Sequence, residues 1–477
     1  MEENINTNNL IKLNQIDDLE LIHIWDYYKK YVNPGQVDLI ASFGFGRDLV
    51  DYAEGCWIYT KSGKRILDFT GGIGVLNHGH NHPKILKSRL AFQKDKKMEV
   101  HKNYFSPYVA ALAHNIAQLL PGDLNISYFP NSGAEAVEGA LKMAYKYHNG
   151  NRKSVLYADI SFHGKLLGAA SVTGSPELSF EFPRIPNTHS FIYNDIDSVK
   201  TILKNLEVAG MSNVYAIILE PFNASSLLKC SKEFLSELRE ICTRNDIILI
   251  FDEIYTGWSK TGELFYFMNF DCIPDILTYA KSFGGGKSSI SGYTCRDHVF
   301  KKAYGNLNDA TLHSTTYNGF GEETLTAIEA INIIIEDDYV SKSKHIFNKI
   351  NPGLIKLKEK YPKIIGDIRG SGALNGILIN AKSKLIDSIS KFIPVDFFKD
   401  ERFLPKLATA AVISELYDEH DILTFYGSNR EIPLIISPSI IVNDDEIDYF
   451  IDALDKTLEK GLITLILKFA KNKFFKI

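Results

Sequence analysis

The sequence predicts an α/β fold with a mostly parallel β-sheet and a second, smaller domain. Between about residues 107 and 324, short runs that are apolar at every position alternate with longer stretches of helical pattern. Continuously apolar strands are typical of a sheet that is covered on both faces. Their alternation with helices indicates the α/β class. The apolar runs include residues 155–158, 216–219 and 247–251, and the helical stretches include 134–147 and 232–244.

The elements on either side of this region follow from shorter signals. The first forty residues are polar with scattered aromatic side chains, which favours helix and loop. Residues 57–60 and 65–69 are strand-like and flank a turn that contains Gly63, so we expect a β-hairpin. After about Glu336 the pattern changes to helices and shorter strands, which indicates a second domain.

Three segments follow from these signals. We expect residues 1–90 to form an N-terminal segment and hairpin that pack on the small domain. Residues 91–335 form the large domain in this interpretation. Residues 336–477 form a small α+β C-terminal domain that ends in a basic, apolar tail.

Bulk composition excludes several classes of protein. A chain of 477 residues with 45% hydrophobic and 23% charged residues is an ordinary globular sequence, and a net charge of −5 gives no case for nucleic acid binding. The five cysteines are scattered without a CxxC pair, which argues against a disulfide framework or a zinc site. The acidic N-terminus lacks a signal-peptide pattern, and no apolar segment reaches the roughly 18 residues that span a bilayer. We therefore expect a cytoplasmic protein that associates with neither nucleic acid nor membrane.

A lysine before a glycine-rich turn and an acid at the end of an apolar run form the strongest signal in the chain. Lys281 precedes Ser-Phe-Gly-Gly-Gly, and Asp252 ends the run 248–251 about thirty residues earlier. Pyridoxal phosphate (PLP) chemistry needs this layout. The lysine forms a Schiff base with the cofactor aldehyde, and the acid pairs with the protonated pyridine nitrogen. Either residue alone is more often structural, but further motifs in the expected order support the cofactor.

Two of these motifs follow predicted strands. Residues 131–136, Asn-Ser-Gly-Ala-Glu-Ala, open a helix after the strand-like segment 127–129. Backbone amides at a helix start make a phosphate cradle, although a simple helix cap explains the same residues. Phe162 and His163 follow the strand that ends near Asp159. An aromatic side chain there can stack on a flat ring, although a core position is the commoner role of each residue taken alone.

A hydroxyl-rich loop completes the set. Residues 313–319, His-Ser-Thr-Thr-Tyr-Asn-Gly, offer a hydroxyl to a phosphate or form an ordinary turn with capping threonines.

Together these signals resemble the class III aminotransferases, a family of fold type I PLP-dependent enzymes. The resemblance runs from about Asn33 to Asp452. It includes the glycine-rich segment 68–75, the phosphate motif 131–138 and the cofactor lysine with its glycines. Its other landmarks are Gly-His-Asn-His-Pro at 79–83, Glu220-Pro221, Asp252-Glu253-Ile254, Thr256-Gly257 and Thr261-Gly262. The resemblance implies a seven-stranded, mostly parallel sheet in the large, PLP-binding domain.

The resemblance also implies a role for each matching residue. Lys281 is the Schiff-base lysine and proton shuttle, and Asp252 pairs with the pyridine nitrogen. Thr316 matches a threonine that reaches the phosphate of the neighbouring subunit's cofactor, so the family pattern implies a homodimer. The remaining cofactor-binding candidates are the phosphate group Ser132, Gly133 and Ala134, the ring-stacking pair Phe162 and Ile254, and the neighbours His163, Glu220 and Tyr255.

The chain departs from the family pattern at several positions. Relatives that use glutamate carry an arginine for the donor's α-carboxylate and a glutamate that pairs with that arginine. Ile435 stands in the arginine's place and Ser225 near the place of the glutamate, so both halves of the charge switch are absent. Lys165 stands where some relatives have an arginine. Tyr255 replaces a glutamine that faces the cofactor's phenolic oxygen, and its hydroxyl either makes a similar bond or points away.

The resulting interpretation is an aminotransferase acting on small-molecule amines and aldehydes. The substrate is expected to be a terminal amine or aldehyde, as for relatives acting on putrescine, ornithine or natural-product aldehydes. A PLP-dependent amino-acid racemase or epimerase of the same family is the alternative reaction. An inactive homologue that serves as a binding protein is the alternative of another class.

The C-terminal segment has two interpretations. Residues 461–477 are apolar and basic, without an acid. The segment either docks to an anionic membrane or acidic partner, or packs on the small domain as a terminal helix. We predict the packed helix.

Overall fold

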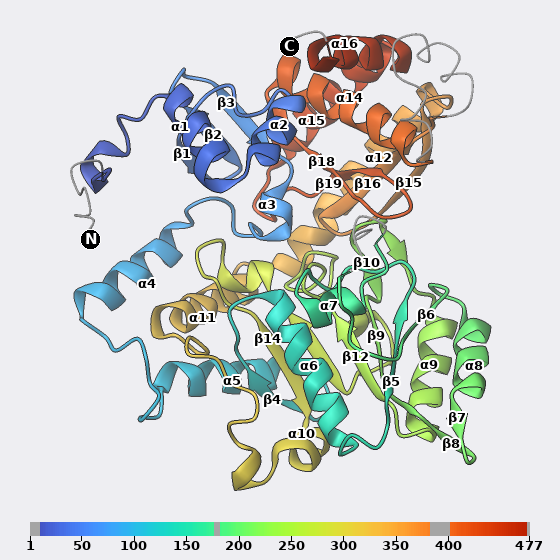
Figure 1. Cartoon of the computed structure of the whole chain (residues 1–477). Coiled ribbons are helices and arrows are strands. Elements are labelled where there is room, and N and C mark those ends of the chain that lie inside the picture. The colour runs from blue at the N-terminus through green and yellow to red at the C-terminus, as the bar shows by residue number, and fades with distance from the viewer. Residues whose placement is uncertain (1–9, 176–181, 382–400, 475–477) are drawn as a thin grey trace, which may run out of the picture.

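A computed structural model describes residues 10–175, 182–381 and 401–474 (Figure 1). The chain forms a lower lobe around a large sheet and an upper lobe that contains the N-terminal hairpin and the C-terminal helices. The lower lobe corresponds to the predicted α/β region. The division at residues 90 and 335 stays a prediction.

The large sheet has seven strands in the order β4-β14-β13-β12-β9-β5-β6. All described pairings are parallel except those of β14, which runs antiparallel to β13 and to β4. The predicted mostly parallel, seven-stranded sheet is therefore confirmed. The strands are β4 (Leu124–Tyr128), β5 (Ser154–Ala158), β6 (Thr188–Phe191), β9 (Val214–Leu219), β12 (Ile248–Asp252), β13 (Ile276–Tyr279) and β14 (Gly292–Arg296).

Helices cover both faces of this sheet, as the continuously apolar strands predict. On β9, Ala216 and Ile218 belong to one hydrophobic cluster, whereas Ile217 and Leu219 belong to another. The first cluster contains the helices α6 (Gly133–Tyr147) and α10 (Asp297–Tyr304). The second contains α5 (Pro107–Leu119), α8 (Ile196–Asn205), α9 (Lys232–Arg244) and α11 (Gly321–Glu336), and α4 (Pro83–Lys94) packs beside α5 and α11 (Figure 1).

The upper lobe contains a second, antiparallel sheet of four strands. Its order is β15 (Ile365–Ser371), β16 (Leu374–Ile379), β19 (Pro433–Ile436) and β18 (Phe425–Tyr426). Three helices pack against it or beside it: α12 (Tyr339–Lys360), α14 (Phe403–His420) and α15 (Asp444–Glu459). The change of pattern predicted after Glu336 therefore coincides with the start of α12.

The predicted hairpin is present and joins the upper lobe. Strands β2 (Trp57–Thr60) and β3 (Arg65–Asp68) pair antiparallel, and β1 (Val50–Glu54) adds a third strand. β3 also pairs in parallel with β17 (Ile422–Leu423), which follows α14. The N-terminal region thus shares a sheet with a segment more than three hundred residues away in the chain.

The C-terminal segment is part of the fold. Helix α16 (Leu462–Phe474) packs beside α14, and its apolar side chains Leu465, Ile466 and Phe469 are buried. On its polar side, the Lys468 ammonium lies 2.8 Å from the buried carboxylate of Glu415. The apolar face that membrane docking requires is therefore occupied within the protein, and the prediction of a packed helix is confirmed. Residues 475–477 lie outside the described residues.

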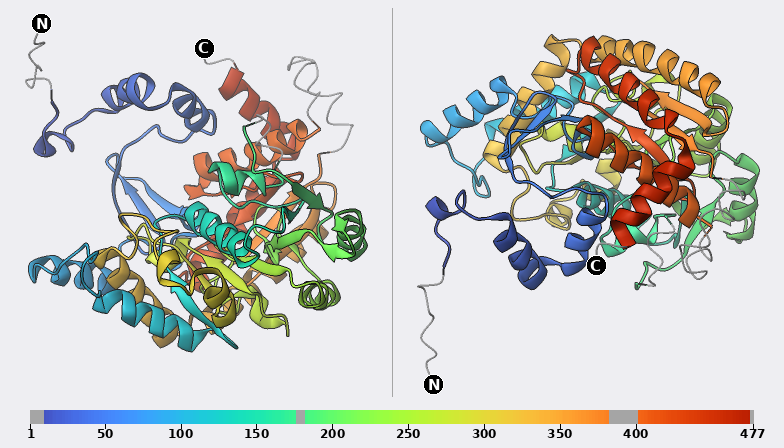
Figure 2. Two further views of the ribbon diagram at one scale, coloured as in Figure 1. Left: turned by 60° about the horizontal axis from the view of Figure 1, so that its bottom comes forward. Right: turned by 90° about the horizontal axis from the view of Figure 1, so that it is seen from above.

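The N-terminal helices pack least on the body. Helix α1 (Leu21–Tyr27), a π-helical turn (Tyr28–Val32) and α2 (Pro34–Ser42) project to one side of the hairpin (Figure 2). Val37 is the one buried residue within these three described elements. None of the described helices combines the length and apolar character needed to cross a membrane.

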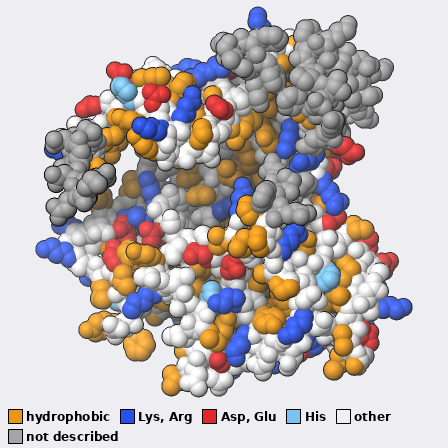
Figure 3. Space-filling model, viewed as in Figure 1, with side chains coloured by type: hydrophobic (Ala, Val, Ile, Leu, Met, Phe, Trp, Pro, Cys, Tyr) orange, Lys and Arg blue, Asp and Glu red, His pale blue; other side chains and the backbone are white. Residues whose placement is uncertain are grey.

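Charges are mixed on the visible surface. On the face shown in Figure 3, basic and acidic side chains are interspersed over the lower lobe. No single-sign patch dominates this face.

Candidate active site

A cavity of about 710 Å³ lies at the carboxyl ends of the large sheet's parallel strands. Ligands of open α/β sheets bind at this edge. The loops after β5, β9, β12 and β13 form its floor, and β18 of the upper lobe contributes to its wall. Every predicted cofactor residue except Thr316 lines it: Ser132, Gly133, Ala134, Phe162, His163, Glu220, Asp252, Ile254, Tyr255 and Lys281.

Lys281 lies on the floor of this cavity. It begins the short 3₁₀ turn Lys281–Gly284 directly after β13, with a backbone φ of 49° that non-glycine residues rarely adopt. Loss of solvent lowers the pKa of Lys281 to about 8, whereas Glu220 and Asp252 act in the opposite direction. A lysine with such a pKa is partly neutral near neutral pH, as a nucleophile and base must be.

Asp252 is the last residue of β12 and is held by two contacts. Its Oδ2 lies 2.7 Å from Nδ1 of His163, and its Oδ1 accepts a 3.0 Å hydrogen bond from the Ile254 amide. The side chains of Asp252 and His163 are both buried. An ionised carboxylate only accepts hydrogen bonds, so Nδ1 of His163 is the donor. The other ring nitrogen, Nε2, is buried and has no partner among the described residues.

Glu220 directly follows β9, the strand beside β12, and is held by backbone and amide donors. It accepts hydrogen bonds from the Phe162 amide at 2.9 Å and from the Asn223 side chain at 2.7 Å. Burial raises the pKa of Glu220 to about 7, and nearby Asp252 adds to this effect, whereas His163 opposes it. Glu220 therefore fixes the segment that carries Phe162 at the cavity wall.

The start of α6 forms the opposite side. Ser132 caps the helix, and the Glu135 carboxylate accepts from the Ser132 amide at 2.8 Å. The amides of Gly133 and Ala134 come first in the helix and have no intrahelical partner, so they are the donors suited to an anion. A Cβ on Gly133 would lie 2.9 Å from the Ile254 side chain. Only glycine allows α6 and the segment after β12 to approach this closely.

The two predicted ring-stacking residues line the same cavity. Phe162 is 42% exposed and Ile254 is partly buried. An exposed phenylalanine at the wall of a cavity has apolar surface free to contact a flat ring. Their stacking on the cofactor stays a prediction.

Thr316 lies outside the cavity and is exposed. Its loop runs beside the start of α6, where the Asn131 side chain donates to the Tyr317 carbonyl at 3.2 Å. Within this one chain Thr316 does not meet the other site residues. A role at the neighbouring subunit's cofactor stays a prediction.

Tyr255 lines the cavity, but its hydroxyl bonds to a residue that does not. Its hydroxyl lies 3.2 Å from Oγ of Ser437, which follows β19 in the upper lobe. Of the two orientations that the sequence leaves open, the structure has the one in which the hydroxyl bonds elsewhere. The Lys281 ammonium lies 3.8 Å from the centre of the Tyr255 ring.

Several lining residues were not predicted as site residues. Some of them lie inside the recognised motifs but had no role assigned to them, and the others come from segments without a motif, including β18 and the residues after it in the upper lobe. They are Ile73, Val75, Asn131, Gly164, Ala224, Ala280, Ser288, Ser289, Ile290, Phe425, Tyr426, Gly427 and Ser428, and the sequence had already singled out Lys165 and Ser225 for other reasons.

The position of the missing charge switch is apolar and closed. Ile435 is 1% exposed and packs with Phe222 and Ala224 in a small hydrophobic cluster. Ser225 lines the cavity and contacts Asn223 and Asn429, both through their side chains. No arginine is among the described lining residues, and Lys165 is the one cation there besides Lys281.

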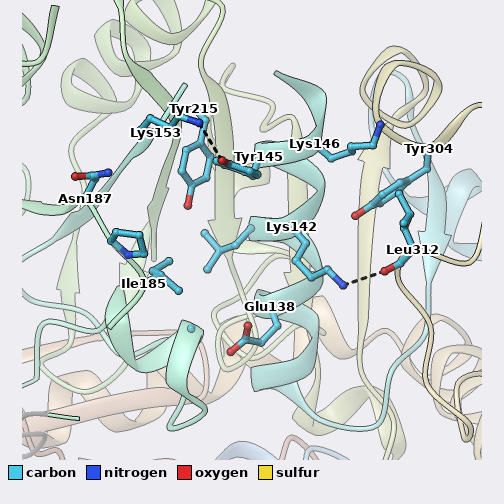
Figure 4. A pocket seen from close by; sticks show the side chains of 13 residues that line it. Glu138, Lys142, Tyr145, Lys146, Lys153, Ile185, Asn187, Tyr215, Tyr304 and Leu312 are labelled. Atoms are coloured by element: carbon cyan, nitrogen blue, oxygen red, sulfur yellow. Dashed lines mark hydrogen bonds between the residues drawn. The ribbon is translucent and has the colours of Figure 1, made fainter. Parts of the chain in front are cut away.

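A second cavity, of about 520 Å³, lies on the outer face of α6 (Figure 4). It contains three lysines, but each has a partner within the protein. Lys142 donates to the Leu312 carbonyl at 3.0 Å, and Lys146 lies 3.4 Å from Asp309. Lys153 donates to the Tyr145 hydroxyl at 3.4 Å. None of the predicted site residues lines this cavity.

The residues of the first cavity fit PLP. Lys281 supplies an amine for the aldehyde, Asp252 an anion for a protonated ring nitrogen, and α6 an anion-binding terminus. The buried, unpartnered Nε2 of His163 shows that this end of the cavity is built for polar groups.

Comparisons with known proteins identify the family. The family model of class-III aminotransferases matches residues 47–458. An acetylornithine aminotransferase from Clostridium acetobutylicum is 32% identical over 384 residues, which cover 77% of this chain and 94% of that protein.

Solved structures support the same fold. A transaminase from the marine bacterium Virgibacillus has a TM-score of 0.74 at 23% identity, covering 89% of this chain and 94% of that one. An ornithine aminotransferase from Toxoplasma gondii ME49 has a TM-score of 0.76 at 20% identity, covering 94% of this chain and 99% of that one. The chain therefore belongs to the class-III aminotransferases and is a PLP-dependent enzyme of fold type I.

Proposed function

We propose that this aminotransferase moves an amino group between a terminal primary amine and an aldehyde or ketone. The observation that carries this proposal is the uncharged side chain at the place of the family's carboxylate-binding arginine. Ile435 is buried and apolar there, and Ser225 offers a hydroxyl where a glutamate would balance an arginine. A donor without an α-carboxylate leaves no charge unpaired in such a cavity.

The residues of the cavity have distinct tasks in this proposal. When bound, PLP supplies an aldehyde for the amino group and a ring that accepts the electron pair of the substrate carbon. Nζ of Lys281 holds the cofactor between turnovers and, once displaced by the substrate amine, moves the proton between substrate and cofactor carbons. Asp252, oriented by His163, keeps a proton on the ring nitrogen. The first amides of α6 hold the phosphate.

An absorbance screen of the holoenzyme tests the substrate class. Each candidate amine is mixed with enzyme in the absence of acceptor, and the cofactor's conversion to its amine form is followed. We expect diamines and other amines without an α-carboxylate to convert the cofactor at least about tenfold faster than L-glutamate, since burying an unpaired carboxylate costs several kcal/mol. L-Glutamate as the fastest donor would refute the proposal. A racemase would return its substrate without build-up of the amine form.

Ile435→Arg is expected to give a poorly active or destabilised enzyme rather than a better glutamate aminotransferase. The new guanidinium would be buried among Phe222, Ala224 and Leu374, with Ser225 unable to offer an anion. An uncompensated buried charge costs about 3–5 kcal/mol. Thermal denaturation and the glutamate half-reaction measure the effect. The matched controls are Ile435→Leu, which keeps the site apolar, and Ile435→Arg combined with Ser225→Glu, which supplies the anion.

We also propose that the enzyme works as a homodimer in which Thr316 reaches the partner's cofactor phosphate. Its exposure and its distance from the chain's own cavity support this. Thr316→Glu is expected to lose most activity, because a carboxylate would face the phosphate, whereas Thr311→Glu in the same exposed stretch should not.

Mixed dimers test whether the site is shared. Refolded together, Thr316→Glu and Lys281→Ala subunits are expected to regain activity, because one site of each mixed dimer then carries neither change. An active monomer in sedimentation, or mixtures no more active than their components, would contradict the shared site.

We propose a reducing compartment such as the cytoplasm for this enzyme. All five cysteines are buried as free thiols, which supports this assignment.

A further inference from the structure

The Lys281 ammonium lies over the face of the Tyr255 ring. Its Nζ lies 3.8 Å from the ring centre of Tyr255, within the range of a strong cation–π contact. The negative face of the ring attracts a positive charge, and the attraction strengthens where water is excluded. The ring of Tyr255 therefore favours the protonated form of the Lys281 amine. In the proposed mechanism this amine gains and loses a proton.

The Tyr255 ring is held in this position by a backbone contact on its face and by a hydrogen bond at its hydroxyl end. A Cβ on Gly74 would lie 2.8 Å from two of its carbon atoms, so the backbone of the Gly71–Gly74 segment rests directly on the ring. At its far end the hydroxyl bonds to Ser437 at 3.2 Å. A side chain held along its length in this way cannot swing aside when Lys281 moves.

The Ser437 anchor is itself held by a buried lysine. Nζ of Lys260 donates to the Pro438 carbonyl at 2.6 Å and to the Ser437 carbonyl at 3.4 Å. Lys260 is 0% exposed and lies in the turn that follows Tyr255. This contact ties the turn after β12 in the lower lobe to the segment after β19 in the upper lobe. The position of the Tyr255 ring thus depends on both lobes.

Other ionisable groups face Lys281 as well. Glu220 and Asp252, at the ends of β9 and β12, favour its charged form. Burial of Lys281 opposes its charged form. Burial also lowers the pKa of neighbouring Lys260 to about 7, and the charge of Lys281 lowers that pKa further. Asp68 and Cys56 act on Lys260 in the opposite sense. The ring of Tyr255 is the one aromatic face in contact with the Lys281 ammonium among the described residues.

We propose that Tyr255 is a positioning residue for Lys281: its ring carries the ammonium formed when Lys281 accepts a proton, and Ser437 keeps the ring in place. The inference rests on the proposed role of Lys281 as the lysine that holds the cofactor. It assigns to Tyr255 a task different from that of the family's glutamine, because the hydroxyl is committed to the other lobe.

Spectroscopic titration of the holoenzyme tests this proposal without relying on turnover. The visible absorbance of the bound cofactor changes as the nitrogen of Lys281 loses its proton, so its pH midpoint reports the stability of the charged form. Tyr255→Leu removes the ring and keeps the site apolar. We expect its midpoint to fall by about 0.5–1 pH unit, because a cation loses its π partner.

The control variants separate ring, hydroxyl and fold. Tyr255→Phe keeps the ring and is expected to stay within about 0.2 unit of wild type, a small shift compared with a cation–π contribution. Tyr255→Met replaces the leucine variant if that protein does not fold, with the same expected shift. An unchanged midpoint in the leucine or methionine variant, or an equal fall in the phenylalanine variant, would overturn the proposal.

Lys281→Ala distinguishes this inference from the proposed function. If it keeps the visible band and its titration, the assignment of Lys281 fails and the inference with it. If it loses the band while Tyr255→Leu titrates like wild type, the inference alone fails.

Discussion

Replacing Lys281 with alanine is expected to abolish turnover, with kcat/KM falling by about 10⁴-fold or more. The amine at this position both holds the cofactor and transfers the proton, and general acid–base catalysis alone contributes about 10²–10⁴-fold. In the described residues, Lys165 is the one other amine that lines the cavity, and it lies on the loop after β5. Steady-state kinetics and the visible absorbance of the purified variant measure the two losses separately.

The matched control is Lys165→Ala, which removes the other lysine of the same cavity. Lys165 is exposed, so the substitution should leave the fold and the absorbance of the bound cofactor intact. Any change in its kinetics should appear mainly in KM, as expected for a residue that contacts only the substrate. If Lys165→Ala loses the absorbance and Lys281→Ala keeps it, the two assignments must be exchanged.

The large sheet could be predicted from sequence because its strands are buried on both faces. The run predicted at 155–158 corresponds to β5, and those at 216–219 and 247–251 correspond to β9 and β12 within two residues. The antiparallel strand β14 was not predicted from pattern. Its sequence, Gly-Tyr-Thr-Cys-Arg, has polar residues at positions that are buried, where Thr294 bonds to Ser127 and Tyr279. Such hydrogen-bonded polar groups remove the apolar signal that marks a buried strand.

The site residues that lie at the ends of strands could be predicted from the sequence. Asp252 and Glu220 close apolar runs, and parallel strands bring their carboxyl ends to one edge. The pairing of His163 with Asp252 was not predicted, because no spacing rule connects residues 89 positions apart. The orientation of the Tyr255 hydroxyl could not be predicted for the same reason, because its partner Ser437 lies 182 positions later in the chain and in the other lobe.

Asp252→Asn is expected to reduce kcat/KM by about 10²- to 10⁴-fold while the protein stays folded. The change removes a charge and little volume, and the amide oxygen still accepts from the Ile254 amide. The new amide nitrogen faces Nδ1 of His163, which can accept from it once the ring takes its other neutral tautomer, so a large loss of stability is not expected. A neutral amide cannot hold a proton on the cofactor's ring nitrogen, so the ring no longer accepts electrons efficiently. Kinetics of the half-reaction with the best donor measure the loss, and thermal denaturation checks the fold.

Asp159→Asn is the matched control, because Asp159 also follows a strand at the same edge of the sheet. Its carboxylate pairs with Arg430 at 2.9 Å and accepts from the Tyr193 amide, but it does not line the cavity. Losing that partly exposed ion pair should change kcat by less than about tenfold, because such pairs contribute about 1 kcal/mol or less. Equal losses in the two variants would mean that Asp252 acts only by holding the sheet edge together. A near wild-type rate for Asp252→Asn would exclude the pairing of Asp252 with the ring nitrogen. Glu220 is the one other acid among the described residues that line the cavity, and its carboxylate is already bonded to Phe162 and Asn223, so it could not replace Asp252.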